Sequence, residues 1–193
     1  MNSAPAQLLV AVLDRLVVVK ISGRANFTLS VDFKRLMAEM RARGRQHFAL
    51  ELGQCLMMDS TFLGVLAGLA LKLAEEQPGC PQAFSLIAPN ARILDMLDNL
   101  GVQHLFRVAD NSAPPPESFS AIEPTGASAP KAEISRTCLE AHELLMAVNP
   151  GNIAKFKDVT AFMAEDLKRQ EGGAAAFLPP EAPGGKDAAA PGS

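Results

Sequence analysis

A strand-like run that leads to an Asp-Ser pair, and from there into a long apolar helical stripe, constrains the fold of this chain most. His47–Leu52 alternates in the manner of a half-buried strand. The stretch Ser60–Glu76 carries leucines at helical spacing, with Gly64 and Gly68 between them, and these glycines would let a helix approach a sheet closely. A strand followed by a sheet-covering helix is typical of α/β proteins.

The flanking segments extend this alternation of strands and helices. Apolar spacing and turn residues predict two strands, at 8–13 and 16–21, joined as a hairpin, and a loop from Gly23. A helix over 31–43 is predicted to follow, with Ser30 as its N-cap and Gly44 as its end. The next predicted elements are a strand at 83–88, a helix that begins at an Asn90 cap and ends at Gly101, and a strand at 104–108. This order predicts a mixed four- to five-stranded sheet with packed helices.

The C-terminal half has a different composition. Residues 111–130 are rich in proline, serine and alanine, which predicts an extended or flexible linker because such a segment buries too little surface to offset its ordering entropy. Two apolar stripes within 131–170, separated by Asn149–Asn152, predict a helical hairpin. Residues 171–193 are dense in alanine, glycine and proline and predict a disordered tail. The predicted first domain is therefore 1–110.

Composition and charge exclude several classes of function. The formal net charge of -3 gives no electrostatic basis for binding nucleic acid. The apolar run Thr61–Leu71 is about half of the roughly 20 residues that a membrane span needs, so we expect no membrane insertion. The N-terminus lacks a basic signal-peptide region, which predicts a cytoplasmic protein. The three cysteines show no close spacing, which favours reduced thiols: Cys55, Cys80 and Cys138.

A search for catalytic and metal-binding residues predicts neither an enzyme nor a cofactor. Phosphate loops, dinucleotide fingerprints and zinc-protease motifs are absent from the sequence. Asp59 adjoins Ser60, so it cannot be the distant orienting acid of a catalytic triad. Cys138 and His142 lie four residues apart on one helical face, but no second ligand pair accompanies them, so we expect no metal site. The scattered histidines are interpreted as structural residues: His47, His104 and His142.

The Asp59-Ser60 pair has both a structural and a functional interpretation. Either residue would be a good N-cap, which contributes about 1 kcal/mol. Alternatively, a phosphate on Ser60 would be tolerated at the positive end of the helix dipole and would change the local charge. Of Met57 and Met58, which adjoin in an extended segment, one must pack inward, and the other could form an exposed apolar contact with Phe62 beside the serine.

The same segment resembles the signature of the STAS domain, which is shared by anti-sigma factor antagonists and sulfate transporter tails. In that family a strand and a short turn precede Asp-Ser-Ser/Thr-Gly-Leu-Gly at the start of a helix. Here the sequence reads Asp59-Ser60-Thr61-Phe62-Leu63-Gly64, with Phe62 in place of the first glycine. The family's early docking loop appears as Gly23-Arg24-Ala25-Asn26, without its two acids.

The resemblance implies a function, partners and site residues. It implies a cytoplasmic regulatory module similar to an anti-sigma factor antagonist, switched by phosphorylation of Ser60. The implied partner is an anti-sigma factor that is also a serine kinase of the histidine-kinase-like ATPase type, with a serine phosphatase as a further candidate. The residues expected at the partner interface are Arg24, Asn26, Met58, Asp59, Ser60, Thr61 and Phe62.

The alternative is a scaffold or adaptor subunit of a signalling or transport complex that is not phosphorylated. In that case Ser60 only caps its helix, and the hairpin over 131–170 holds a partner of its own. The intact Asp59-Ser60-Thr61 sequence favours the switch, whereas the missing acids at Arg24 and Asn26 favour the adaptor.

Overall fold

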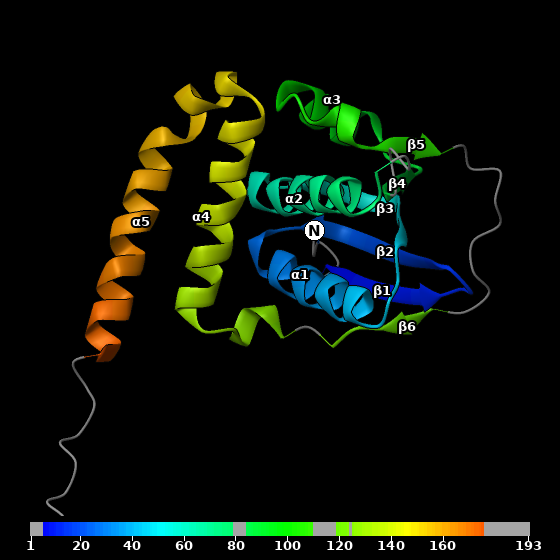
Figure 1. The fold of residues 1–193 in the computed structure, drawn as a ribbon, viewed down its shortest axis with the longest axis horizontal. Helices are drawn as coiled ribbons and strands as arrows, with labels where there is room; N and C mark the ends of the chain where they lie inside the picture. The colour runs from blue at the N-terminus through cyan, green and yellow to red at the C-terminus, as the bar shows by residue number, and fades with distance from the viewer. Residues whose placement is uncertain (1–5, 79–83, 110–118, 124, 176–193) are drawn as a thin grey trace, which may run out of the picture.

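A six-stranded mixed sheet forms the centre of the molecule (Figure 1). The computed structural model describes residues 6–78, 84–109, 119–123 and 125–175. In order across the sheet the strands are β5 (Arg107–Ala109), β4 (Phe84–Ile87), β3 (His47–Met58), β2 (Leu16–Ala25), β1 (Gln7–Val12) and β6 (Ser120–Ala121). The strands β2 to β5 are mutually parallel, β1 is antiparallel to β2, and β6 is antiparallel to β1. The predicted hairpin and mixed sheet are confirmed.

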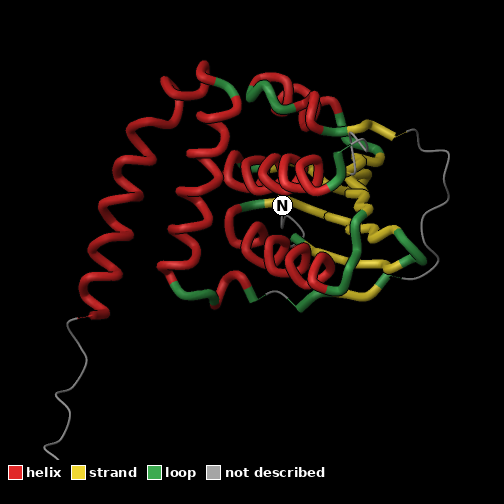
Figure 2. The backbone as a smooth tube through the Cα atoms, in the orientation of Figure 1, coloured by secondary structure: helices red, strands yellow, loops and turns green. Residues whose placement is uncertain are grey.

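Three helices connect the parallel strands and cover the sheet. They are α1 (Phe27–Ala42), α2 (Ser60–Glu76) and α3 (Ala91–Asn99). The strand order advances in one direction from β2 to β5, and right-handed crossovers then place all three helices on the same face. Figure 2 shows α1 and α2 lying side by side over the strands. The largest fully buried side chains between these layers include Phe33, Phe48, Phe62, Phe84, Leu50, Leu63 and Leu66.

The predicted helical hairpin is present and packs on this helical layer. Its helices are α4 (Lys131–Val148) and α5 (Ile153–Ala175), joined by the 3-10 turn η3 (Pro150–Asn152). Figure 1 shows α4 crossing one end of both α1 and α2, with α5 on its outer side. The turn is fixed by Asn152, whose buried amide donates to the carbonyls of Leu100 and Leu145, both at 2.9 Å.

Polar contacts tie the segment around α4 to α1. Lys34 pairs with Glu140 at 2.5 Å, and Arg35 pairs with Glu133 at 2.6 Å. Exposed pairs of this kind contribute little stability, roughly 0 to 1 kcal/mol each, but they fix the register of α4 along α1. The buried carboxylate of Asp32 accepts hydrogen bonds from the backbone and hydroxyl of Thr125, at 3.2 and 2.7 Å.

The prediction of an extended or flexible linker over 111–130 is corrected where the structure describes this segment. This segment contributes β6 and the 3-10 turn η2 (Gly126–Ser128), so the sheet has six strands rather than four to five. The predicted tail is also corrected at its start, because α5 continues to Ala175. Residues 110–118, 124 and 176–193 lie outside the described residues, as does Cys80.

Several predicted boundaries were wrong because long-range pairing extends the elements. No loop begins at Gly23, since β2 continues to Ala25 and pairs with β3 as far as Met58, with register shifts on the way. The first helix begins at Phe27 with an Asn26 cap.

Two further boundaries also differ from prediction. Ser30, predicted as the N-cap, lies inside α1 and donates to the Phe27 carbonyl at 2.6 Å. The last predicted strand begins later than expected, because 103–105 form the 3-10 turn η1 (Gln103–Leu105) before β5. Among the described residues, no helix has both the length and the apolarity needed to cross a membrane.

Candidate functional site

Asp59 and Ser60, two of the predicted site residues, lie at the start of α2, where the structure gives each a different role. Asp59 is the N-cap: its carboxylate accepts a hydrogen bond from the Phe62 backbone N–H at 2.8 Å. Ser60 is the first helical residue, so its hydroxyl is not used for capping. This cap directly follows the C-terminal end of β3. The Asp59 N–H donates to the Ala25 carbonyl of β2 at 2.9 Å, which joins the C-terminal ends of both strands at the site.

The Ser60 hydroxyl lies against α4, where its Oγ is 2.9 Å from Nε2 of His142. The other ring nitrogen, Nδ1, is 2.8 Å from the Cys138 carbonyl, which can only accept a hydrogen bond. A neutral imidazole therefore carries its proton on Nδ1, and Nε2 accepts the proton of the serine. The ring is buried and packs against Phe156 with a centroid distance of 4.8 Å. Ser60 is thus part of an interhelical contact rather than a free surface.

Close packing of α2 against α4 surrounds this hydrogen bond. A Cβ atom built at Gly64 would lie 2.5 Å from the backbone oxygen of Ala141, so the two helices meet at a distance that only glycine permits. Thr61 of α2 and Cys138 of α4 are both buried, and Leu145 is fully buried in the main core cluster. The helix α4 therefore covers the first turns of α2 through apolar as well as polar contacts.

Burial also changes the ionisation of Asp59. Its pKa is raised above the ordinary value of 3.8, chiefly because burial disfavours the charged carboxylate. Backbone N–H groups of Phe62 and Phe27, together with the electrostatic effect of the nearby His142, lower this pKa without cancelling the effect of burial. The ionised cap therefore costs some stability at neutral pH.

Replacing Asp59 by asparagine is expected to flatten the dependence of stability on pH in the acid range. Between the ordinary pKa of the unfolded chain and the raised pKa of the folded one, the folded state binds more protons, so stability falls as pH rises. The asparagine variant keeps an N-cap acceptor but has no such titration. Urea unfolding at a series of pH values would measure this, and parallel curves for both proteins would contradict the assigned burial.

The predicted interface residues are only partly where a partner could reach them. Met58 and Phe62 were both expected at the interface, and Phe62 was expected to form an exposed apolar contact with one of the two methionines. Met58 and Phe62 are fully buried, which corrects that prediction, and Met57 is the methionine that is only half-buried. Phe62 points inward because the first turn of α2 faces the core, where its ring lies 5.1 Å from that of Phe33. The exposed apolar side chains of this region are instead Leu56 on β3 and Phe27 at the start of α1.

The segment that corresponds to the docking loop does lie beside the site. Arg24 pairs in register with Met57, and Arg24 and Asn26 are both exposed. The Asn26 side chain is occupied as the cap of α1, accepting from the Leu29 N–H at 3.1 Å and from the Thr28 hydroxyl at 2.7 Å. The structure therefore brings together Arg24, Asn26, Asp59 and Ser60, and it adds His142, which was interpreted from the sequence as a structural residue.

The cysteines near the site have little thiolate character. Burial raises the pKa of both Cys55 and Cys138, which keeps these thiols protonated at neutral pH. In the part of the chain that the structure describes, no three histidine, cysteine or acidic residues gather as metal ligands.

Comparison with known proteins gives similarities of structure only. Searches of protein-family models and of curated proteins found no match. The similar solved structures include the anti-sigma factor antagonist SpoIIAA in its unphosphorylated form, which is 17% identical; the match covers 54% of this chain and 88% of that one, with a TM-score of 0.44. An anti-sigma factor antagonist from Mycobacterium paratuberculosis is 20% identical, with 55% and 88% covered and a TM-score of 0.45. A putative antagonist from Thermotoga maritima is 19% identical, with 51% and 82% covered and a TM-score of 0.44. The described order of strands and helices is that of the STAS-like fold predicted from the sequence.

Proposed function

We propose that this chain is a cytoplasmic regulatory protein-binding module, similar to an anti-sigma factor antagonist, in which Ser60 is the regulated residue and α4 competes with the partner for the start of α2. The observation that carries the proposal is the hydrogen bond between Ser60 Oγ and His142 Nε2 at 2.9 Å. It identifies the serine of the STAS-like motif as part of a contact that modification must break.

Phosphorylation would act on this contact directly. A phosphate replaces the hydroxyl proton that Nε2 accepts, adds about -1.5 to -2 charges, and brings three acceptor oxygens. These oxygens would face a nitrogen that is itself an acceptor, within a contact already so close that Gly64 is required nearby. The positive end of α2 would tolerate the charge on the domain itself. Phosphorylation of Ser60 and docking of α4 therefore exclude one another.

The proposed partner would use the same surface in the unmodified protein. By the resemblance stated above, this partner is an anti-sigma factor with serine kinase activity, and a serine phosphatase would restore Ser60. Once α4 has moved away, the partner meets a neutral serine with the exposed apolar side chains of Leu56 and Phe27 nearby. An apolar patch beside a switchable charge suits a reversible interface, since adding the charge costs both repulsion and desolvation. We propose no catalytic role for the chain.

Substitution of Ser60 is expected to separate the two interactions. Ser60→Ala should still bind the partner from native extract but resist its release by ATP. Ser60→Asp should bind the partner weakly, and in the purified protein it should speed hydrogen exchange over 131–148 by placing a carboxylate against His142. Pull-downs with and without ATP, combined with hydrogen-exchange mass spectrometry, measure both effects. Ser120→Asp, which adds the same charge at an exposed strand residue, is the matched control.

Two outcomes would count against this proposal. If wild-type, alanine and aspartate forms retain the same partners and exchange equally over α4, Ser60 is only a structural contact and the adaptor alternative holds. If Ser60→Asp slows exchange over α4, the carboxylate is pairing with a protonated His142, and the charge closes the contact that we propose it opens.

A further inference from the structure

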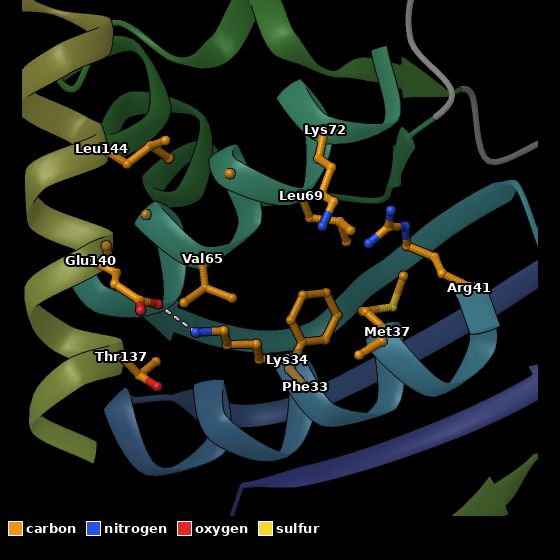
Figure 3. Close-up of a pocket in the computed structure, with 14 residues that line it drawn as sticks. Phe33, Lys34, Met37, Arg41, Val65, Leu69, Lys72, Thr137, Glu140 and Leu144 are labelled. Atoms are coloured by element: carbon orange, nitrogen blue, oxygen red, sulfur yellow. Dashed lines mark hydrogen bonds and ion pairs between the residues drawn. The ribbon is translucent and has the colours of Figure 1, made fainter. Parts of the chain in front are cut away.

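A second candidate site lies apart from Ser60, in a cavity of about 320 Å³ between α1, α2 and α4 (Figure 3). This volume is at the lower end of the range for small-molecule sites. The walls are formed by apolar side chains from all three helices: Phe33, Met37, Val65, Leu69 and Leu144. Gly68 on α2 also lines the cavity, and its lack of a side chain leaves space there, since an added Cβ atom would lie 3.3 Å from the Leu144 side chain.

Positive charge is concentrated at one end of this cavity. Figure 3 shows Lys72 of α2 and Arg41 of α1 pointing toward one another there. Arg41 pairs with Glu76, and its Nε is enclosed by protein atoms and has no hydrogen-bond acceptor among the described residues. Lys72 forms no ion pair with any described residue. This end of the cavity therefore holds two cations and one carboxylate, and that carboxylate pairs with Arg41, which leaves the positive charge of Lys72 uncompensated.

The opposite end is electrically neutral. There Lys34 and Glu140 pair at 2.5 Å across the mouth between α1 and α4. The cavity is therefore polarised along its length, with an apolar middle, a cationic end and a neutral end. This distribution matches a molecule with one anionic group and one apolar chain, because the charged group can pair with the Lys72 ammonium while the chain lies along the apolar walls.

We propose that this cavity binds a small amphiphilic carboxylate of the fatty-acid type. The binding itself does not depend on the function proposed for Ser60. Its consequence does, because the ligand would contact Leu144 and Ala141 of the same helix that carries His142. A ligand that binds only when α4 is docked stabilises that state by mass action, so it would lower the accessibility of Ser60.

The test is calorimetric titration of the full chain with decanoate below its micelle concentration. We expect saturable one-site binding, with decanol and acetate each binding at least about tenfold more weakly because one lacks the charge and the other the chain. Lys72→Glu should weaken decanoate binding at least about tenfold. Arg43→Glu, which makes the same charge change on a neighbouring exposed arginine that does not line the cavity, should leave the affinity unchanged.

Other results would overturn the proposal. Equal affinity for decanol and decanoate would mean an apolar crevice without a head-group site. Equal losses in Lys72→Glu and Arg43→Glu would mean nonspecific attraction to the surface. Binding only to vesicles that contain anionic lipid, and not to free decanoate, would assign the cations to a membrane surface. None of these measurements involves modification of Ser60. A result that overturns ligand binding therefore leaves the function proposed for Ser60 untouched, and the reverse also holds.

Discussion

Replacing Phe62 by alanine is expected to lower the free energy of unfolding by about 3 to 5 kcal/mol, as for other large side chains removed from a core. The side chain is fully buried in the first turn of α2, and its ring packs against that of Phe33. Urea unfolding followed by circular dichroism measures the loss. Phe162→Ala is the matched control, because that ring is 63% exposed on α5 and its removal should change stability by roughly 0.5 kcal/mol or less.

A small effect at Phe62 would contradict the packing described here. It would mean that the Phe62 ring is exposed, as the sequence suggested, and that a partner can contact it. A loss of the expected size limits the apolar part of any interface at this site to side chains such as Leu56 and Phe27.

Replacing Gly64 by alanine is expected to displace α4 and destabilise the protein by about 1 to 3 kcal/mol, the usual cost of overpacking. The added Cβ would lie 2.5 Å from the backbone oxygen of Ala141, and a backbone atom cannot move aside as a side chain can. In an exposed helix the same change would stabilise by about 1 kcal/mol. Hydrogen exchange should therefore accelerate over α4 and α5 while the sheet stays protected.

Gly68→Ala, one turn further along α2, is the control for this prediction. Its Cβ would meet only the flexible end of Leu144, at 3.3 Å, so helix propensity should dominate and stability should stay level or rise. If Gly64→Ala behaves in the same way as Gly68→Ala, the two helices are not held at the distance described.

Local signals predicted much of the fold. The limits of α2 agree with the prediction because Asp59 supplies a side-chain cap at its start and the turn residue Pro78 follows its end. The cap of α3 at Asn90 is confirmed by its hydrogen bond to the Ile93 N–H. The two apolar stripes of 131–170 likewise form α4 and α5. In each case the deciding interactions lie within a few residues along the chain.

Long-range pairing explains what the sequence did not predict. Gly23 is typical of a loop, yet it lies in β2 because β3 supplies partners on the adjacent strand, and a positive φ of 77° is accommodated where the register shifts. The pair Ser120–Ala121 has no strand signal of its own and is a strand only because β1 offers an open edge. Such pairings depend on residues far apart in sequence.

Only part of the candidate site was predicted, because the rest of it also depends on contacts between residues far apart in sequence. The motif located Ser60 at a helix start without ambiguity, because the cap and the apolar stripe are adjacent in sequence. Its contact with His142 joins residues 82 apart. The spacing of Cys138 and His142 with Leu145 did indicate one buried helical face, but an apolar stripe does not specify which surface will cover it.

In the function proposed here, the connection between β6 and α4 would make the opening of the Ser60 surface an intramolecular event. The segment 122–130 joins α4 to a strand at the sheet edge, so α4 that leaves α2 stays tethered nearby. Tethers of this length give effective concentrations of about a millimolar. A free partner with equal contacts, present at about a micromolar, would hold the surface in roughly one molecule in a thousand. Occupancy would then follow the cellular level of the partner, and cutting the chain within 122–130 would convert the competition into one between separate molecules.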